Sequence, residues 1–298
     1  MAVQKMFNYE NNEVTSMLVV GTLIVVSVVG IIVNAILLCV LRQLPERSTS
    51  FTLIWTVGGA DLLLCGFTLA MCIARPILQY PGAYHSWYYC SILGSATFFF
   101  SSMSGILMGF LAMERYSVIC HQRGLRHGFI WFSFFFIAAV FGVLLTENAL
   151  EGGFAPEPSF IFCMAKGSEW SLYTNYVFYV LLNTPIAIFS FCYIAIFIKC
   201  YTANVPSDAE VITKRVAIRS LLFLAIYLLC YIPKLSTTII GIYFGLNAPP
   251  KALYMIIPIG MTMLAVVNPI LVLLLHRHIK ARVRSLLLHK KPEAIRLD

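Results

Sequence analysis

Long apolar stretches alternate with short polar stretches along the whole chain. Seven apolar runs are bounded by charged and turn-forming residues, and they cover residues 17–41, 51–74, 88–119, 128–146, 172–198, 216–242 and 252–275. An α-helix needs about 20 apolar residues to cross the hydrocarbon core of a bilayer, and every run approaches or exceeds that length. The runs are continuous and do not alternate in polarity, which favours helices over the strands of a membrane barrel. The pattern therefore predicts an all-α protein, a seven-transmembrane helix bundle.

The composition agrees with a membrane protein and excludes a soluble one. Of the 298 residues, 60% are hydrophobic and 11% are charged, and the mean hydropathy is +0.85. Because such a small number of polar residues cannot cover a water-exposed surface, lipid must be the main solvent. We expect one domain over residues 1–298, with an N-terminal segment (1–16), the helix bundle (17–275), a helix at the membrane surface (276–288) and a tail (289–298).

The basic residues predict the orientation of the bundle, because Lys and Arg accumulate in loops that stay cytoplasmic. With the N-terminus outside, 16 of the 21 Lys and Arg residues fall on the inner side. The others are Lys5, Arg75, Lys166, Lys234 and Lys251. We therefore expect a multi-pass protein of the plasma membrane with an extracellular N-terminus and a cytoplasmic C-terminus. The net charge of +8 follows from this asymmetry and suits anionic membrane lipid, so no nucleic-acid partner is expected.

The segment after the seventh run has the pattern of a helix lying on the membrane. Its apolar residues recur at helical spacing among Arg277, Lys280, Arg282 and Arg284, and they are Ile279, Val283, Leu286 and Leu287. This arrangement predicts a short amphipathic eighth helix at the cytoplasmic interface over residues 276–288. A basic stop-transfer segment without helical structure is the alternative.

Short motifs lie at comparable depths in several of the predicted helices. The third run ends in Glu114-Arg115-Tyr116. Further motifs are Gly30 and Asn34, Asp61, Pro185 and Tyr193, Cys230-Tyr231-Ile232-Pro233, and Asn268-Pro269. In these motifs the chain resembles the rhodopsin-like (class A) G-protein-coupled receptors over nearly its whole length. The resemblance implies a receptor that binds an extracellular ligand and activates a heterotrimeric G protein when the inner end of helix six is displaced.

The resemblance implies a G-protein coupling site at the inner end of the third helix. Its members are Glu114, Arg115, Tyr116 and Tyr193. In the resting state Arg115 would pair with Glu114, and in the active state it would move toward Tyr193 and the C-terminal helix of Gα. An arginine at the membrane boundary that simply extends into water is the alternative. Thr213 stands where an acidic partner often lies, so a strong lock between helices three and six is not expected.

Asp61 lies within the second apolar run and must face the bundle interior, because an ionisable side chain in lipid costs about 2.5–3.5 kcal/mol. Its expected partners are Asn34, Ser104 and Asn268. In the receptors that the chain resembles, this constellation holds a sodium ion, so Asp61 and Ser104 are the candidate metal ligands. A protonated Asp61 that acts as a hydrogen-bond hub is the alternative. Leu264 and Ala265 replace polar residues usual near that ion, which argues against tight sodium binding.

Prolines interrupt three of the predicted helices and are candidate hinges. They are Pro185, Pro233 and Pro269, and each removes a backbone hydrogen bond within its helix. Membrane helices also carry prolines that do not move, so a static kink is the alternative. Tyr231 is the fourth hinge candidate and replaces the tryptophan that usually precedes the sixth-helix proline. Val272 replaces the tyrosine that usually ends the Asn-Pro motif, so the water-bridged contact of that tyrosine with Tyr193 is not expected.

Only two of the nine cysteines, Cys90 and Cys163, lie on the outer side. An oxidising compartment would join them in a disulfide that ties the loop before the fifth helix to the third helix, and two free thiols are the alternative.

By resemblance, the ligand-binding candidates in the outer half are Thr97, Phe98, Ser101, Tyr231, Lys234 and Thr262. Thr97 stands where amine receptors carry an aspartate, so a non-aminergic ligand is expected. Lys234 is an ammonium group in the outer half of the membrane and needs an anion. The anion is either a ligand carboxylate or phosphate, or a loop acid such as Glu147 or Glu151.

Other functions lack the residues that they require. Retinal needs a lysine in the seventh helix, where this chain has Thr262, so no retinal cofactor is expected. The six histidines lie in loops or at boundaries, so no metal hydrolase site and no enzyme activity are expected. A small transporter or channel that uses the buried Asp61 is the remaining alternative. Transporters usually carry internal repeats or paired broken helices, and the sequence contains neither.

Overall fold

Most of the predicted bundle is present in the structure, a computed structural model. It describes residues 13–43, 48–78, 87–150, 154–156, 163–165, 169–202, 218, 221–233, 235–236, 239–240 and 251–275. The helices are α1 (Glu13–Arg42), α2 (Thr49–Leu78), α3 (Trp87–His121), α4 (His127–Leu150), α5 (Glu169–Thr202) and α7 (Lys251–Leu275). We call the described residues between 218 and 240, which include the apolar helix Leu221–Pro233, the sixth-helix segment.

Each of the seven apolar runs coincides with helical residues, which confirms the predicted fold class. Among the described residues, six helices are long and apolar enough to cross a membrane. The helices extend a few residues beyond the runs because backbone hydrogen bonding continues into the polar boundary. For example, α5 begins at Glu169 and ends at Thr202, whereas the apolar run covers 172–198. The predicted helix at 276–288, the tail at 289–298 and Lys234 lie outside the described residues.

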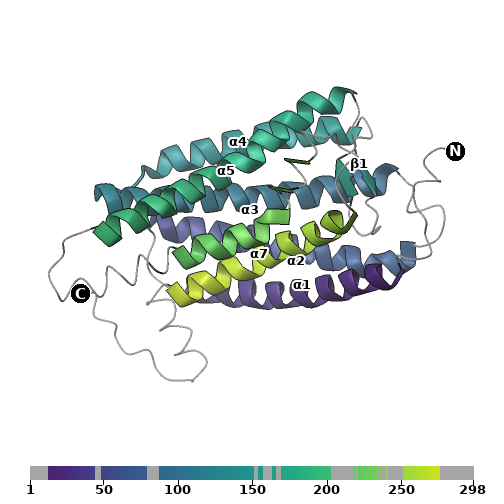
Figure 1. Ribbon diagram of the computed structural model, residues 1–298, viewed down its shortest axis with the longest axis horizontal. Helices are drawn as coiled ribbons and strands as arrows, with labels where there is room; N and C mark the ends of the chain where they lie inside the picture. The colour runs from purple at the N-terminus through teal and green to yellow at the C-terminus, as the bar shows by residue number, and fades with distance from the viewer. Residues whose placement is uncertain are drawn as a thin grey trace, which may run out of the picture.

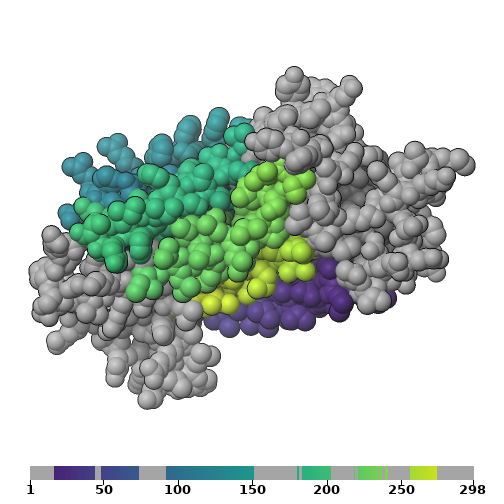
Figure 2. Space-filling view, in the orientation of Figure 1, coloured from purple at the N-terminus to yellow at the C-terminus, as the bar shows by residue number. Residues whose placement is uncertain are grey.

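The helices pack around α3, which runs through the middle of the bundle (Figure 1). On one side α3 contacts α2, and α1 and α7 pack against α2 and against each other. On the other side α3 contacts α4 and α5. The sixth-helix segment lies between α5 and α7, where its light green atoms separate the two helices on the visible face (Figure 2). This order closes a ring of helices around a buried interior.

Two glycines allow neighbouring helices to approach closely. A Cβ atom added at Gly30 of α1 would overlap the sulfur of Cys65 in α2. A Cβ atom added at Gly260 of α7 would lie 2.5 Å from the carbonyl oxygen of Cys230 in the sixth-helix segment. Only glycine leaves room at these two contacts, so they fix the distance of α1 from α2 and of α7 from the sixth-helix segment.

A small hairpin, which the apolar pattern did not predict, lies in the loop between α4 and α5. Strands β1 (Phe154–Pro156) and β2 (Cys163–Ala165) pair antiparallel, with Phe154 opposite Ala165 and Pro156 opposite Cys163. Both strands contact α3, the helix that carries Cys90. The side chains of Cys90 and Cys163 lie outside the described part of the structure, so their disulfide stays a prediction.

Candidate functional site

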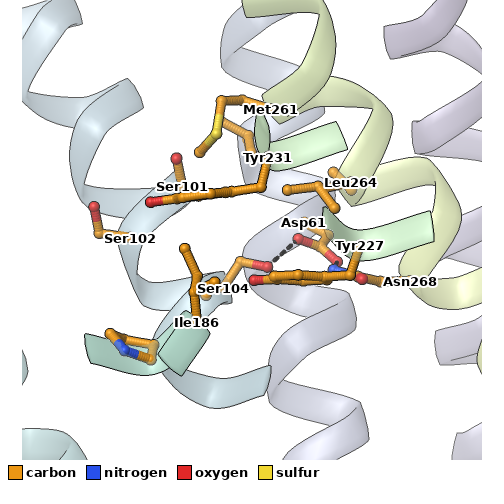
Figure 3. A pocket seen from close by; sticks show the side chains of 14 residues that line it. Asp61, Ser101, Ser102, Ser104, Ile186, Tyr227, Tyr231, Met261, Leu264 and Asn268 are labelled. Carbon is orange, nitrogen blue, oxygen red and sulfur yellow. Dashed lines mark hydrogen bonds between the residues drawn. The ribbon is translucent and has the colours of Figure 1, made fainter. Parts of the chain in front are cut away.

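Asp61 joins three helices through its carboxylate group, as Figure 3 shows. Its side chain is 0% exposed. The Ser104 hydroxyl of α3 donates a hydrogen bond of 2.5 Å to Oδ1, and the Asn268 amide of α7 donates one of 3.1 Å to Oδ2. Asp61 therefore faces the bundle interior, and two of its three expected partners hydrogen-bond to it directly. We call Asp61, Ser104 and Asn268 the Asp61 hub.

Asn34 lies near the hub, but its hydrogen bonds connect other groups. Its side-chain amide donates to the carbonyl oxygen of Gly30 in the same helix and to that of Ala265 in α7, both at 2.9 Å. Asn34 therefore fastens α1 to α7 and has no direct hydrogen bond to Asp61, which corrects the expected direct contact. The buried Oδ1 atoms of Asn34 and Asn268 have no hydrogen-bond partner among the described residues.

A small cavity, which we call the upper cavity, lies above the hub, toward the predicted ligand side. Its lining includes Asp61, Ser101, Ser104, Tyr227 and Tyr231 (Figure 3). The volume open to the centre of a water molecule is about 20 Å³. A cavity needs about 10–15 Å³ by this measure to hold one water, so the space suits one ordered water molecule and no larger ligand. The cavity brings two ligand-binding candidates, Ser101 and Tyr231, together with the hub.

A second cavity, which we call the lower cavity, lies on the other side of Asp61 and is bordered almost entirely by hydrocarbon. Asn34, Asp61 and Asn268 are its polar members. The apolar ones are Leu37, Ile54, Val57, Met108, Leu111, Pro269 and Val272, beside Gly58. Val272 is buried at this place, so the side chain that ends the Asn-Pro motif contributes apolar packing and no hydroxyl.

The inner end of α3 brings together residues of the predicted coupling site. The buried Glu114 carboxylate accepts a hydrogen bond from the Ser50 hydroxyl near the start of α2. Arg115 lies near enough to Tyr193 of α5 for its charge to act on that hydroxyl, although the hydroxyl makes no well-formed hydrogen bond with a described group. The Tyr116 ring centroid lies 6.0 Å from that of Phe191. Arg115 and Tyr193, which are far apart in sequence, therefore face each other between α3 and α5.

Comparison with known protein families identifies this arrangement. The family model described as 7 transmembrane receptor (rhodopsin family) matches residues 33–271, well over half of the chain. The chain belongs to this receptor family. No curated protein sequence matches it closely enough to name a nearer relative. Family membership makes the protein a multi-pass signalling receptor. It favours a receptor over a transporter or channel that would use the buried Asp61. Receptors of this family act through G proteins and extracellular ligands in general.

Aromatic rings connect the upper cavity of the receptor to the coupling site. Tyr227 of the sixth-helix segment stacks on Phe189 of α5, with ring centroids 4.3 Å apart. Phe189 also contacts Tyr193, at 4.7 Å, and Phe223 stacks on Tyr193 at 5.2 Å. All four side chains are buried. We call Phe189, Tyr193, Phe223 and Tyr227 the aromatic seam, since they form the contact between α5 and the sixth-helix segment.

Thr97, Phe98 and Thr262, the other ligand-binding candidates that the structure describes, do not line the upper cavity. The Thr97 hydroxyl lies 3.9 Å from the sulfur of Met71 in α2. Thr262 is buried and donates its hydroxyl hydrogen bond to the Pro258 carbonyl of its own helix, at 2.8 Å. Phe98 packs against the main hydrophobic core, and Lys234 lies outside the described residues.

The hinge candidates lie close to the contacts described above. Pro185 is inside α5, packs against Gly109 of α3 and borders the upper cavity. Pro269 follows Asn268 directly and borders the lower cavity, so the backbone hydrogen bond that a proline removes from α7 is lost next to the hub. Pro233 ends the longest described stretch of the sixth-helix segment. Their positions are therefore established, and their role in motion stays a prediction.

The donor set of the hub can be compared with the needs of a sodium ion. Carboxylate and hydroxyl oxygens, as in Asp61 and Ser104, are the ligands that hard cations prefer. The partnerless Oδ1 of Asn268 adds another oxygen near them. Leu264 and Ala265 also border the cavity and add only hydrocarbon side chains. The hub supplies few ligand oxygens and the cavity has room for about one water, so the site suits a weakly held cation and not a tightly bound one.

Three residues of the site were not predicted from the sequence, and they are Ser50, Gly105 and Tyr227. Ser50 lies in a polar stretch before the second run, where nothing marks it as the partner of a glutamate 64 positions away. Gly105 and Tyr227 are separated by more than one hundred residues and meet only in the folded bundle. One signal was available for Tyr227, because a tyrosine hydroxyl in the middle of an apolar run needs a polar partner.

Proposed function

We propose that this receptor binds a non-aminergic extracellular ligand and activates a heterotrimeric G protein by displacement of the inner end of the sixth-helix segment. The observation that carries the proposal is the continuous contact path from the upper cavity to Arg115. Tyr227 borders that cavity and stacks on Phe189 of α5. Phe189 contacts Tyr193, which lies beside Arg115. A ligand that shifts the outer part of the path would therefore change the environment of Arg115 at the inner end.

The ligand would bind on the outer side of the upper cavity, where Ser101 and Tyr231 offer hydroxyl groups. Thr97 provides no negative charge for an amine, and Asp61, the only charged residue bordering the described cavity, already accepts two hydrogen bonds. A neutral ligand suits this lining better than a cation, and an anionic ligand would need a positive charge from outside it. Lys234 would receive a ligand carboxylate or phosphate, and an unchanged potency of anionic agonists on the Lys234→Ala variant would remove that role.

The Arg115 region supports the coupling role. The Ser50 hydroxyl donates a hydrogen bond to the Glu114 carboxylate and so competes with Arg115 for that group. This leaves Arg115 able to interact with Tyr193. A Gα C-terminal helix would enter between α3, α5 and the sixth-helix segment and contact Arg115. Tyr193 is well placed to hold the guanidinium group in that state, because it packs against Phe223 of the moving segment.

A sodium ion, where bound, would be held by Asp61 and Ser104 and would supply a positive charge that neutralises the buried carboxylate. The carboxylate is also stabilised without the ion, because Ser104 donates a hydrogen bond to Oδ1 and Asn268 donates one to Oδ2.

The predicted orientation, with the N-terminus outside the plasma membrane, is part of the same proposal and rests on the basic residues.

The test measures nucleotide exchange on a panel of purified Gα subunits by the full chain in lipid nanodiscs. Receptor activity predicts faster exchange with at least one Gα, with or without a ligand from a screen. Arg115→Ala should reduce that rate at least tenfold, because it removes the guanidinium group that contacts Gα. Arg42→Ala is the matched control, since Arg42 is an exposed basic residue at the end of α1, and it should retain the rate.

Two results would contradict the proposal. Full exchange activity of Arg115→Ala would exclude the coupling role of this residue. Ion or solute flux in liposomes without a G protein, lost in Asp61→Asn, together with no exchange on any Gα, would favour the transporter.

A further inference from the structure

Tyr227 presents a hydroxyl group to the interior of the receptor from the sixth-helix segment. Its side chain is buried, and its ring is held in place by stacking on Phe189. In Figure 3 the ring of Tyr227 extends from the sixth-helix segment past Asp61, and its hydroxyl lies beside Ser104. A buried tyrosine hydroxyl normally has a hydrogen-bond partner, because burying it without one costs free energy. No hydrogen bond joins this hydroxyl directly to another described side chain.

The Tyr227 hydroxyl lies next to Gly105 of α3. A Cβ atom added at Gly105 would have one side-chain neighbour within 4 Å, the Tyr227 hydroxyl oxygen at 3.7 Å. A branched side chain at position 105 would need the space where this oxygen lies. Gly105 follows Ser104 directly, so the gap opens next to the hydroxyl that donates to Asp61. The Tyr227 hydroxyl is therefore close to the α3 backbone beside Ser104, where a small side chain would still fit but a large one would meet it.

The upper cavity connects this hydroxyl to the Asp61 hub. Tyr227, Gly105, Ser104, Asp61 and Asn268 all border it, and its volume open to a water centre is about 20 Å³. One ordered water fits this volume and would have enough polar partners. A water-mediated hydrogen bond is nearly as favourable in enthalpy as a direct one.

The geometry points to Tyr227 as a positioning residue that joins the sixth-helix segment to the Asp61 hub through one ordered water beside Gly105. Outward displacement of the segment withdraws the hydroxyl from this cavity and breaks the connection. Its effect on signalling rests on the proposed function, whereas its effect on stability does not. The hydroxyl thus favours the arrangement in which the sixth-helix segment lies against α3.

The first test is a double-mutant cycle on the thermal unfolding of the full chain in nanodiscs. Tyr227→Phe removes only the hydroxyl and should lower the unfolding temperature by about 2 °C. In the Asp61→Asn background the same change should have less than half of this effect, because bonds to a charged acceptor are the stronger ones. An equal loss in both backgrounds, or a rise in unfolding temperature with Tyr227→Phe, would overturn the inference.

The control removes a hydroxyl outside the cavity. Tyr201→Phe changes an exposed tyrosine near the end of α5 and should leave the unfolding temperature unchanged. Gly105 offers a second cycle that does not depend on Asp61. Gly105→Val should lower the unfolding temperature, and adding Tyr227→Phe should recover part of the loss because the phenyl ring leaves room for the new methyl groups. No recovery would show that the hydroxyl does not occupy the Gly105 space.

The signalling test uses basal nucleotide exchange on the Gα that responds best to the wild-type receptor. Tyr227→Phe should raise the basal rate about fivefold, which is the population shift expected from losing one hydrogen bond. A lower or equal basal rate, together with the expected stability cycle, would exclude the signalling role. If no Gα responds, the proposed function fails, and the stability cycle still decides whether Tyr227 is joined to the hub.

Discussion

Two sides of the receptor are held together by contacts of different kinds. Between α1, α2, α3 and α7 the apolar packing is supplemented by directed hydrogen bonds, in which Asn34 binds the Ala265 carbonyl and Asp61 accepts from Ser104 and Asn268. Between α5 and the sixth-helix segment the contacts are ring faces, and the members of the aromatic seam lie 4.3–5.4 Å apart between centroids. The same closed bundle therefore combines a polar half with an aromatic half.

The two kinds of contact respond differently to displacement. A hydrogen bond between buried groups has a narrow geometry, and breaking it leaves a donor or acceptor without a partner. Stacked rings attract through many weak contacts that change little when one ring slides over another. We therefore expect the hub side to act as the rigid frame and the aromatic seam to allow the sixth-helix segment to move. Tyr227 connects the two sides, since it belongs to the seam and borders the hub cavity.

Removing the centre of the aromatic seam should have the largest effect on stability. Phe189 is 1% exposed and contacts Tyr193, Phe223 and Tyr227. Phe189→Ala leaves a cavity and should lower the free energy of unfolding by about 3–5 kcal/mol. Denaturation of the full chain in nanodiscs would measure it. Phe132→Ala is the matched control, because Phe132 of α4 is 73% exposed, and it should change stability by less than about 0.5 kcal/mol.

Equal effects of the two phenylalanine variants would contradict the comparison, because they would show that the seam is no better packed than a surface facing lipid.

Filling the close contact between α7 and the sixth-helix segment should have the next largest effect. Gly260→Ala places a Cβ atom 2.5 Å from the backbone oxygen of Cys230, which cannot move away without shifting its helix. We expect a loss of about 2 kcal/mol in stability and, if the segment is pushed outward, higher basal nucleotide exchange. Gly142→Ala in α4 is the control, since nothing lies within 4 Å of the added atom there. It should be neutral or stabilising by up to about 1 kcal/mol.

The apolar pattern was sufficient to predict the helices but not the contacts between them. Runs of about 20 apolar residues have few alternatives in lipid, so the seven runs and the helices agree closely. The cost of burying Asp61 likewise predicted an interior position, and Ser104 and Asn268 as partners. Asn34 was expected at the same carboxylate, but its amide binds Ala265, because a carbonyl of α7 lies within its reach. Hydrophobicity does not specify such distances.

The hairpin and the Gly105–Tyr227 contact were beyond sequence reasoning for different reasons. Each strand of the hairpin contains only three residues, too few for a period-two pattern to be recognised. The Gly105–Tyr227 contact depends on the rotation of the sixth-helix segment about its axis relative to α3, which is set by packing. Helical periodicity gives the apolar face of a helix, but in lipid every face is apolar and the signal is weak.

Removing one donor from the hub should have a smaller and more local effect than either change above. Ser104→Ala deletes the hydrogen bond of 2.5 Å to Asp61 and should cost about 1.5 kcal/mol. Ser102→Ala is the matched control two residues earlier, because that hydroxyl donates to the Phe98 carbonyl of its own helix. It should cost less than about 0.5 kcal/mol, since the helix keeps its backbone bonds. Thermal unfolding of both variants in nanodiscs measures the difference, and a larger loss for Ser102→Ala would reverse the assignment of the hub.

Sodium should have the smallest effect, because the hub already holds its carboxylate with protein donors. Ser104 and Asn268 occupy both oxygens, and Leu264 and Ala265 add no ligand. Replacing 150 mM choline chloride by sodium chloride at constant ionic strength should stabilise the receptor by only about 0.5 kcal/mol, as expected for a dissociation constant of about 0.1 M. Asp61→Asn should abolish even this increment, because it removes the carboxylate charge. A stabilisation above about 2 kcal/mol that Asp61→Asn removes would show that the ion, and not the Ser104 and Asn268 donors, holds the polar half together.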